Sequence, residues 1–254
     1  MTAKKRKPTA VQLVIETIMS RIKEGRYIPG QYLIAGDLME ELKLSKAPVR
    51  EAIHVLVGEG VIELLQNRSA RIRSLSMDEL IDFSEVWAAI GGVNVRLAAD
   101  SMKLKANQAR VKQALKPILE SEKTKNGANY FAAVSNFHLI LSEISGNTYI
   151  TQMVNRSNFG HFYRHISGIY PGTHWRRHVD AFQKITVTIL AGKGDTAERI
   201  YRKHMQWVIA HLKTAQGEPQ GRLLVFTNFI RGFLVNLKPG LIQHDLIIIN
   251  RLFC

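Results

Sequence analysis

Residues 45–60, SKAPVREAIHVLVGEG, predict a short helix that presents one side to a partner outside the protein. Ser45 can accept a backbone N–H as the capping residue, and Pro48 falls in the first turn, where a missing N–H has no intrahelical partner to lose. Apolar side chains recur at helical spacing and form one face: Val49, Ala52, Ile53 and Leu56. The other face carries Lys46, Ala47, Arg50 and His54. Gly58 and Gly60 end the helix.

The residues on either side of this helix predict a winged helix-turn-helix. An amphipathic pattern at residues 11–22 indicates a first helix, and residues 37–44 form a second one, which leaves room only for a tight turn before residue 45. Two β-prone runs follow, at residues 61–65 and 70–75, and they flank a polar segment that contains an arginine. These runs predict a hairpin with a basic tip, which is the wing.

The composition favours a basic intracellular protein of two domains. The chain has 254 residues, 46% of them hydrophobic, and a formal net charge of +14, which favours polyanionic partners although many basic proteins bind no DNA. The one cysteine, Cys254, excludes an intramolecular disulfide framework and a cysteine-based zinc finger, and it suggests a reducing compartment. No signal peptide or uncharged 18-residue apolar run is visible. We therefore expect a cytoplasmic protein with no membrane partner. Residues 1–9 are expected to form a flexible basic arm, either solvated or in contact with phosphates.

Residues 10–76 resemble the DNA-binding domain of the GntR family of bacterial transcription regulators. The resemblance joins a Gly-x-Tyr-x-Pro-Gly turn at residues 25–30 to the Pro-Val-Arg-Glu-Ala helix at residues 48–52. In that family an arginine, a threonine and a second arginine at the start of the recognition helix face DNA. The corresponding residues here are Lys46, Ala47 and Arg50.

The resemblance implies a set of DNA-contacting residues on the helix and the wing: Ser45, Lys46, Ala47, Arg50, Arg68 and Ser69. Lys46 replaces the usual arginine but can still reach O6 or N7 of guanine, and Ala47 can contact a thymine methyl group. Arg50 is expected to contact a phosphate or a base, the alternative being a surface ion pair. Ser69 stands where the wing of the family carries glycine, and Arg68 supplies positive charge there.

From residue 77 onward the pattern changes to long amphipathic helices. We expect them at residues 77–101, 105–123, 129–145, 148–167, 174–192 and 195–214. The simplest arrangement is an all-α antiparallel bundle, so the predicted fold class is mostly α with one small β-hairpin.

Residues 77–216 resemble, more loosely, the FCD-type domain of the FadR-like subfamily, which binds effectors and forms oligomers. The supporting residues are 136–140 with 145–147, and 189–192 with 202–204. The resemblance implies a homodimer, a roughly palindromic operator in double-stranded DNA and a small organic effector, often a carboxylate.

Many FCD domains hold a divalent metal on an aspartate and three histidines. Ungapped transfer of these ligands places them at Val134, His138, Phe182 and His204. Valine and phenylalanine cannot bind a metal, and such sites need at least three protein ligands, so no cofactor is assigned and a divalent metal is not favoured. His178, one turn before Phe182, can serve if the register is shifted. His138, His178 and His204 stay candidates for an effector pocket or a metal site.

Other residues indicate an altered effector pocket. Trp87 and Gly91 stand where the family tends to place arginine and glutamate, which predicts a more apolar ligand. The pairs His161/His165 and His174/His178 have the i, i+4 spacing of metal ligands but are interpreted as surface or pocket-lining histidines. Alternatively, the arginines among residues 164–177 attract an anionic effector.

These patterns favour a transcription regulator, more often a repressor in this family, whose operator affinity depends on effector occupancy. The alternative is a ligand-independent or architectural DNA-binding protein with a decayed pocket. An enzyme is not predicted, because a hydrolase would need paired carboxylates or a nucleophile–base spacing. Residues 217–254 begin like a linker and continue with interrupted apolar segments. Their role is left open between packing on the bundle, association and a non-family appendage.

Overall fold

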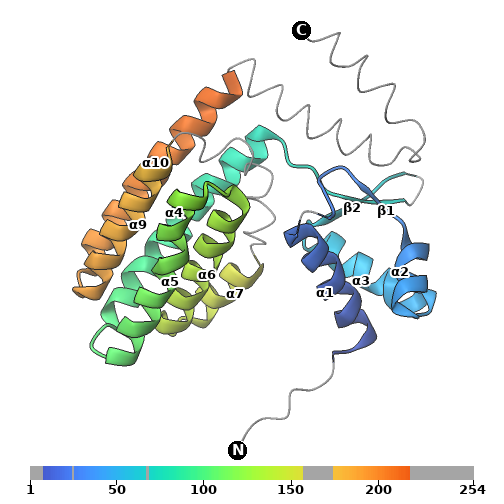
Figure 1. The fold of residues 1–254 in the computed structure, drawn as a ribbon, viewed down its shortest axis with the longest axis horizontal. Helices are drawn as coiled ribbons and strands as arrows, with labels where there is room; N and C mark the ends of the chain where they lie inside the picture. The colour runs from blue at the N-terminus through green and yellow to red at the C-terminus, as the bar shows by residue number, and fades with distance from the viewer. Residues whose placement is uncertain (1–7, 25, 67–68, 157–173, 218–254) are drawn as a thin grey trace, which may run out of the picture. The chain divides into compact units, whose positions relative to one another are not determined.

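The computed structural model describes residues 8–24, 26–66, 69–156 and 174–217 (Figure 1). The described residues form two units that divide between Ser74 and Leu75. Several predictions concern residues outside the described ranges: most of the basic arm, Arg68, His161, His165, and residues 218–254 of the extension. Among the described helices, none is both long and apolar enough to cross a membrane.

The first unit is a winged helix-turn-helix, as the sequence predicts. Its elements in chain order are α1 Ala10–Lys23, β1 Tyr32–Leu33, α2 Ala35–Leu42, α3 Lys46–Gly58, β2 Ile62–Leu64 and β3 Ala70–Ile72. The turn between α2 and α3 is made by Lys43, whose backbone is left-handed with φ of 53°. Buried apolar side chains from every helix and strand of the unit join in one core, which includes Ile18, Leu38 and Leu56.

The sheet has three strands in the order β1-β3-β2, all antiparallel neighbours. The hairpin of β2 and β3 is the predicted wing, with Glu63 paired to Arg71 in the register. β1 was not expected from the sequence, because a strand of two residues carries no readable alternation. It exists because β3 offers a free edge, and backbone hydrogen bonds extend the pairing from Gly30 to Ile72 and from Ile72 to Gln31.

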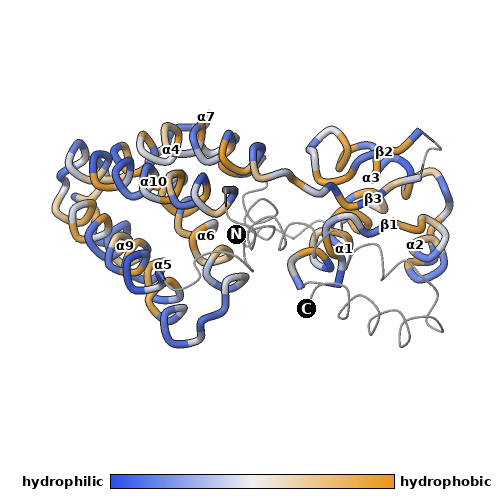
Figure 2. The backbone as a smooth tube through the Cα atoms, turned by 90° about the horizontal axis from the view of Figure 1, so that it is seen from above, coloured by the Kyte–Doolittle hydropathy of each residue, from blue (hydrophilic) through white to orange (hydrophobic). Residues whose placement is uncertain are grey.

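The second unit is an all-α bundle. Its described helices are α4 Met77–Asp100, α5 Lys105–Thr124, α6 Gly127–Ser145, α7 Thr148–Arg156, α9 Trp175–Leu190 and α10 Gly194–Gly217. The expected helix 148–167 is described only as far as Arg156, and the other five lie within two residues of their expected starts. Apolar and polar residues alternate along the helices in Figure 2, as amphipathic helices require.

Helix α4 holds the bundle together, because it packs against α10, α6 and α9. It begins at a capping box in which the Ser76 hydroxyl accepts a hydrogen bond from the Glu79 N–H at 3.1 Å, while the Glu79 carboxylate accepts one from the Ser76 N–H at 2.8 Å. Its inner face alternates between large and small residues. Trp87 is buried there one turn before Gly91, and both lie toward the centre of the bundle.

Candidate nucleic-acid interface and buried histidine centre

The exposed face of α3 carries the helix residues of the predicted DNA-contacting set. Ser45, Lys46, Ala47 and Arg50 are all exposed, while Val49, Ala52, Ile53 and Leu56 on the opposite side are buried in the core. The buried face thus determines which side chains point to solvent. Lys46, Arg50 and His54 are spaced by one turn each, so they form a single row along the exposed face.

Ser45 occupies the capping position of α3, but its side chain makes no capping hydrogen bond, so the prediction that it accepts a backbone N–H is wrong. The physical reason lies in the first turn of the helix. A capping serine bonds the N–H of the second or third helical residue, and the third residue here is Pro48, which has no N–H. The first N–H groups of α3 therefore remain available to an anion in front of the helix.

Lys46 and Arg50, the two basic side chains at the start of this face, have no carboxylate partner among the described residues. Within the part of the chain that the structure describes, no ion pair involves Lys46 or Arg50, whereas other arginines of the same unit, such as Arg21 and Arg71, do pair with carboxylates. The alternative of a surface ion pair for Arg50 thus finds no partner among the described residues. The guanidinium is positioned for a ligand from outside.

A side-chain ion pair braces the two strands of the wing. Arg71 of β3 donates to Glu63 of β2 at 2.6 Å, directly across the two strands. The Leu65 N–H donates to the Ser69 carbonyl at 2.9 Å, and Ser69 itself is half-buried. Arg68, the basic residue expected at the tip, lies outside the described residues.

The three candidate histidines of the second unit come from different helices and meet inside the bundle. His138 of α6, His178 of α9 and His204 of α10 are 1%, 0% and 7% exposed. The rings of His178 and His204 lie 5.1 Å apart between centroids. Phe182 stands between His204 and His138, with centroid distances of 5.8 and 6.5 Å. Two histidines are therefore neighbours, and the third is separated from them by a phenyl ring.

Two tyrosine hydroxyls hold two of these histidines in place. Tyr201 Oη lies 3.2 Å from His138 Nε2, and Tyr130 Oη lies 3.2 Å from His178 Nδ1. Burial lowers the pKa of His138 to about 3 and that of His204 to about 4, with the positive charge of Arg177 adding to the effect on His204. Burial, and next the neighbouring His204, lowers the pKa of His178 well below its usual value. All three rings are therefore neutral at pH 7.

Large side chains fill the space around His138. The Trp87 ring meets the His138 ring edge to face at 5.2 Å between centroids. A Cβ atom at Gly91 would lie 2.4 Å from Tyr201 Oη, so only glycine at this position leaves room for the tyrosine. Gly91, where the family tends to place glutamate, thus makes room for the Tyr201 ring, whose hydroxyl contacts His138. Tyr201 was not singled out in the sequence, although it precedes His204 by one helical turn and so shares its face.

The residues present do not fit a divalent metal site of the FCD type. Val134 and Phe182 offer no lone pair, and His138 Nε2 faces the Tyr201 hydroxyl. Among the described residues, no three histidine, cysteine, aspartate or glutamate side chains are grouped to hold a metal ion. His178 does lie beside His204, as a shifted register would require, but these two rings alone fall short of three ligands.

Comparison with known proteins matches each unit to a family model. Residues 10–72 match the bacterial regulatory proteins of the gntR family, and residues 82–206 match the FCD domain. The chain is 29% identical to a probable D-xylose utilization operon transcriptional repressor of Paenarthrobacter nicotinovorans, over 51% of this chain and 57% of that relative, which is less than two thirds of its length. It is 24% identical to the Glc operon transcriptional activator of Escherichia coli K12, over 79% of this chain and 88% of the relative. The solved structure of E. coli McbR/YncC has the same fold, with a TM-score of 0.68 at 17% identity over 81% of this chain and 98% of the other.

Proposed function

Because the chain belongs to the GntR family of bacterial transcription regulators and carries an FCD domain, we propose that it recognises an operator through the exposed face of α3. The family and the relatives are regulators, so the chain is a regulator and not an enzyme. Repression is the proposed outcome, supported by the relative from Paenarthrobacter nicotinovorans that is described as a repressor. The activator among the relatives makes the sign a matter for experiment.

The row of exposed residues on α3 is the observation that carries this proposal. Arg50, with five N–H donors and no carboxylate partner among the described residues, can form a bidentate contact with a guanine or a phosphate. Lys46 can reach the same groove edge, and the methyl group of Ala47 can contact thymine. The uncapped first turn of α3 adds backbone N–H groups that suit a phosphate. Arg68 and Ser69 of the wing are proposed to approach the neighbouring backbone.

Two copies of the chain are proposed to bind one operator. A homodimer places two recognition helices in successive major grooves, roughly 34 Å apart, and a palindromic site matches that symmetry. The support for this is the FCD domain, which in such regulators accompanies oligomerisation.

We also propose that the histidine centre holds no metal, so that binding of any effector does not depend on one. The support is that no three metal-binding side chains are grouped among the described residues, and that the rings of Trp87 and Tyr201 occupy the space around His138. The competing function, a ligand-independent DNA-binding protein, shares this filled centre. The two differ in whether operator affinity changes when a small molecule binds elsewhere in the second unit.

The test is fluorescence anisotropy with the DNA that flanks the protein's own gene, titrated with salt and compared with a scrambled duplex of equal length. Arg50→Ala should lose about 5- to 150-fold in affinity for the specific duplex, corresponding to about 1–3 kcal/mol, and little for the scrambled one. Lys46→Ala should lose less, because a lysine contact is single rather than bidentate.

Lys112→Ala is the matched control. Lys112 is exposed on α5 in the other unit, and its removal changes the net charge by the same amount. It should leave the ratio of specific to nonspecific affinity unchanged. An equal loss in Arg50→Ala and Lys112→Ala would show that charge alone holds the DNA, and the regulator would have to read its site with other residues. Transcription from the same promoter, with and without protein, decides between repression and activation.

A further inference from the structure

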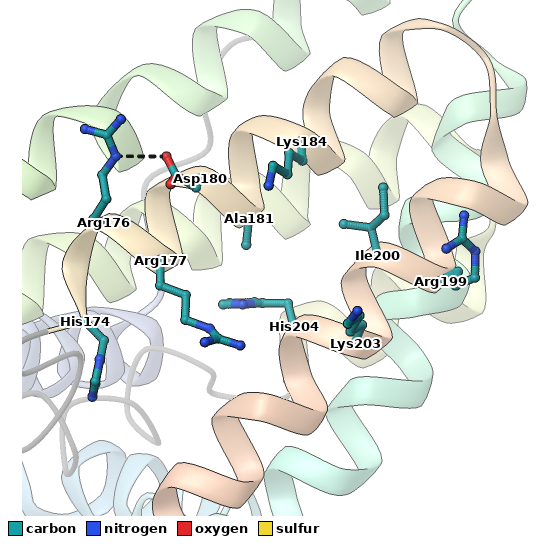
Figure 3. A pocket seen from close by; sticks show the side chains of 10 residues that line it. All are labelled: His174, Arg176, Arg177, Asp180, Ala181, Lys184, Arg199, Ile200, Lys203 and His204. Carbon is teal, nitrogen blue, oxygen red and sulfur yellow. Dashed lines mark hydrogen bonds and ion pairs between the residues drawn. The ribbon is translucent and has the colours of Figure 1, made fainter.

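A groove of about 700 Å³ runs between α9 and α10, on the outside of the histidine centre. Figure 3 shows the side chains that line it, which come from these two neighbouring helices. The lining residues are His174, Arg176, Arg177, Asp180, Ala181, Lys184, Arg199, Ile200, Lys203 and His204. The groove is large enough for a metabolite of ordinary size.

The lining is strongly positive, with five lysines and arginines against one aspartate. That aspartate, Asp180, is already engaged, because Arg176 donates to it at 3.1 Å and also lies 3.8 Å from Glu122 of α5. Arg176 and Asp180 therefore neutralise each other at one side of the groove, as the dashed line in Figure 3 marks. Four cations remain on the other sides: Arg177 and Lys184 from α9, and Arg199 and Lys203 from α10.

No carboxylate neutralises these four cations within the described part of the chain. Neighbouring positions of α10 do form ion pairs, since Glu198 accepts from Arg96 at 2.9 Å and from Arg202 at 2.8 Å, but Arg199 and Lys203 do not. Four like charges around one concave space repel each other, and concave, low-dielectric walls concentrate their field. A ligand that removes this repulsion has to be negatively charged.

The guanidinium of Arg177 is pre-positioned by an aromatic platform. It lies over the Trp207 ring at 4.1 Å from the ring centre, and Trp207 stacks on His211 with centroids 5.6 Å apart. A cation held by a ring face keeps its N–H groups for another acceptor. His204 forms part of the lining and stays neutral, so its ring adds no further positive charge at the centre.

We propose that the groove between α9 and α10 binds a small organic molecule that carries at least two negative charges, as phosphate or carboxylate groups. Arg177 and Arg199 supply planar donors for bidentate contacts, and Lys184 and Lys203 supply point charges on each side. As an effector site, the groove rests on the proposed regulator function, whereas anion binding itself does not.

Effector action needs a path from the groove to the rest of the bundle, and α10 provides one. An anion that contacts cations of both helices, Arg177 or Lys184 on α9 and Arg199 or Lys203 on α10, would draw the two helices together. On another face, α10 packs along α4 and is tied to it by the Glu198–Arg96 ion pair. Any shift of α10 is therefore transmitted to the central helix of the second unit.

The first experiment measures anion binding by isothermal titration calorimetry on the full chain at constant ionic strength. Pyrophosphate and citrate are the probes, since they present phosphate and carboxylate groups separately, and acetate is the singly charged control. At least one of the two probes should bind, and acetate should not. Arg199→Gln combined with Lys203→Gln should weaken binding at least tenfold. Absence of binding by both probes would overturn the proposal.

The matched control removes the same charge elsewhere. Lys112→Gln combined with Lys116→Gln alters two exposed residues of α5 that do not line the groove, and binding should change by less than twofold. Equal weakening in both double variants would overturn the proposal, because it would reveal general attraction by net charge. Without any anion, the groove variant should unfold at a higher temperature than the wild type, since like-charge repulsion is relieved.

Operator binding then separates the site from its role. With the bound probe, the operator affinity of the wild type should change and that of the groove variant should not. Anion binding with unchanged operator affinity would support the site and overturn its role as an effector site. A groove variant that binds no less anion but loses DNA affinity would assign the groove to DNA and overturn the proposal. If the wild type does not bind the operator at all, the proposed function is contradicted, but the calorimetric evidence for the anion site remains.

Discussion

Replacing Gly91 with alanine tests whether the bundle centre is built around the Tyr201–His138 contact. In an ordinary buried helix this change would add about 1 kcal/mol of stability from helix propensity. Here the new Cβ atom would lie 2.4 Å from Tyr201 Oη and 2.7 Å from two ring carbons. Real Cβ atoms do not approach heavy atoms so closely, so the tyrosine ring must move.

The Tyr201 ring cannot move without a loss of stability. Tyr201 is 1% exposed, and its hydroxyl lies 3.2 Å from His138 Nε2. Overpacking a core costs about 1–3 kcal/mol, and separating a buried hydrogen-bonded pair costs about 1–3 kcal/mol more. After subtracting the gain in helix propensity, we expect Gly91→Ala to lower the free energy of unfolding by about 1–5 kcal/mol.

The neighbouring glycine is the matched control. A Cβ atom at Gly92 would meet Arg202 and Glu198 at 3.1–3.3 Å. These are flexible side chains at the edge of the bundle, and they can move by a few tenths of an ångström. Gly92→Ala should therefore change stability by no more than about 1 kcal/mol, because its small steric cost is offset by the same propensity gain.

The assay is urea unfolding followed by tryptophan fluorescence. The three tryptophans, Trp87, Trp175 and Trp207, all lie in the second unit, so fluorescence reports its unfolding and not that of the winged helix. In a protein that already carries Tyr201→Leu, adding Gly91→Ala should cost far less stability than it costs in the wild type, because the clashing ring is gone. If Gly91→Ala is as stable as Gly92→Ala, the close packing of Tyr201 against α4 is wrong.

Three further results are expected. Between pH 7 and pH 5 the free energy of unfolding of the second unit should fall by about 2 kcal/mol for each of His138 and His204, because these rings take up protons near pH 6.5 in the unfolded chain but only at pH 4 and below in the folded one. This contribution to stability is fully present above pH 6.5 and is lost as the pH falls. A urea midpoint that stays constant over this range would contradict the prediction. Ser76→Ala should cost about 1 kcal/mol through loss of the capping box of α4, while Ser76→Thr should be nearly neutral in the same assay. Treatment with a chelator, or addition of Zn²⁺, should leave the melting temperature unchanged; a rise of several degrees with Zn²⁺ would show that the histidine centre opens to a metal.

Short-range patterns in the sequence were enough to predict the winged helix. The apolar spacing around Val49 and Leu56 specifies which face of α3 is buried, and the hairpin follows from two β-prone runs. β1 was not predicted, because its pairing depends on β3, nearly forty residues later in the chain. The capping role of Ser45 failed for a local reason that was readable in principle, since Pro48 removes the third N–H of the helix.

The buried centre could be predicted only in part. His138, His178 and His204 were identified from the resemblance and do lie inside the bundle. Their partners could not be derived, because the fit of Tyr201 over Gly91 joins residues far apart in the chain and depends on how α4 and α10 pack. Part of the basic groove was anticipated, because the arginines among residues 164–177 were considered as an anion site, but the groove itself could not be derived. Its cations are ordinary exposed residues on each helix, and only the facing of α9 and α10 gathers them.

The position of β3 between β1 and β2 has a consequence for how this scaffold can vary among regulators. Its backbone is anchored on both sides, so an insertion within Ala70–Ile72 would disrupt two pairings at once. The Leu65 N–H donates to the Ser69 carbonyl where the hairpin closes. Because this hydrogen bond lies between the strands and the turn, we expect loops of other lengths and charges between these two residues to leave the strand register unaltered. The wing tip is thus the part of the winged helix that can vary among regulators, while the sheet and the core that position α3 stay constant.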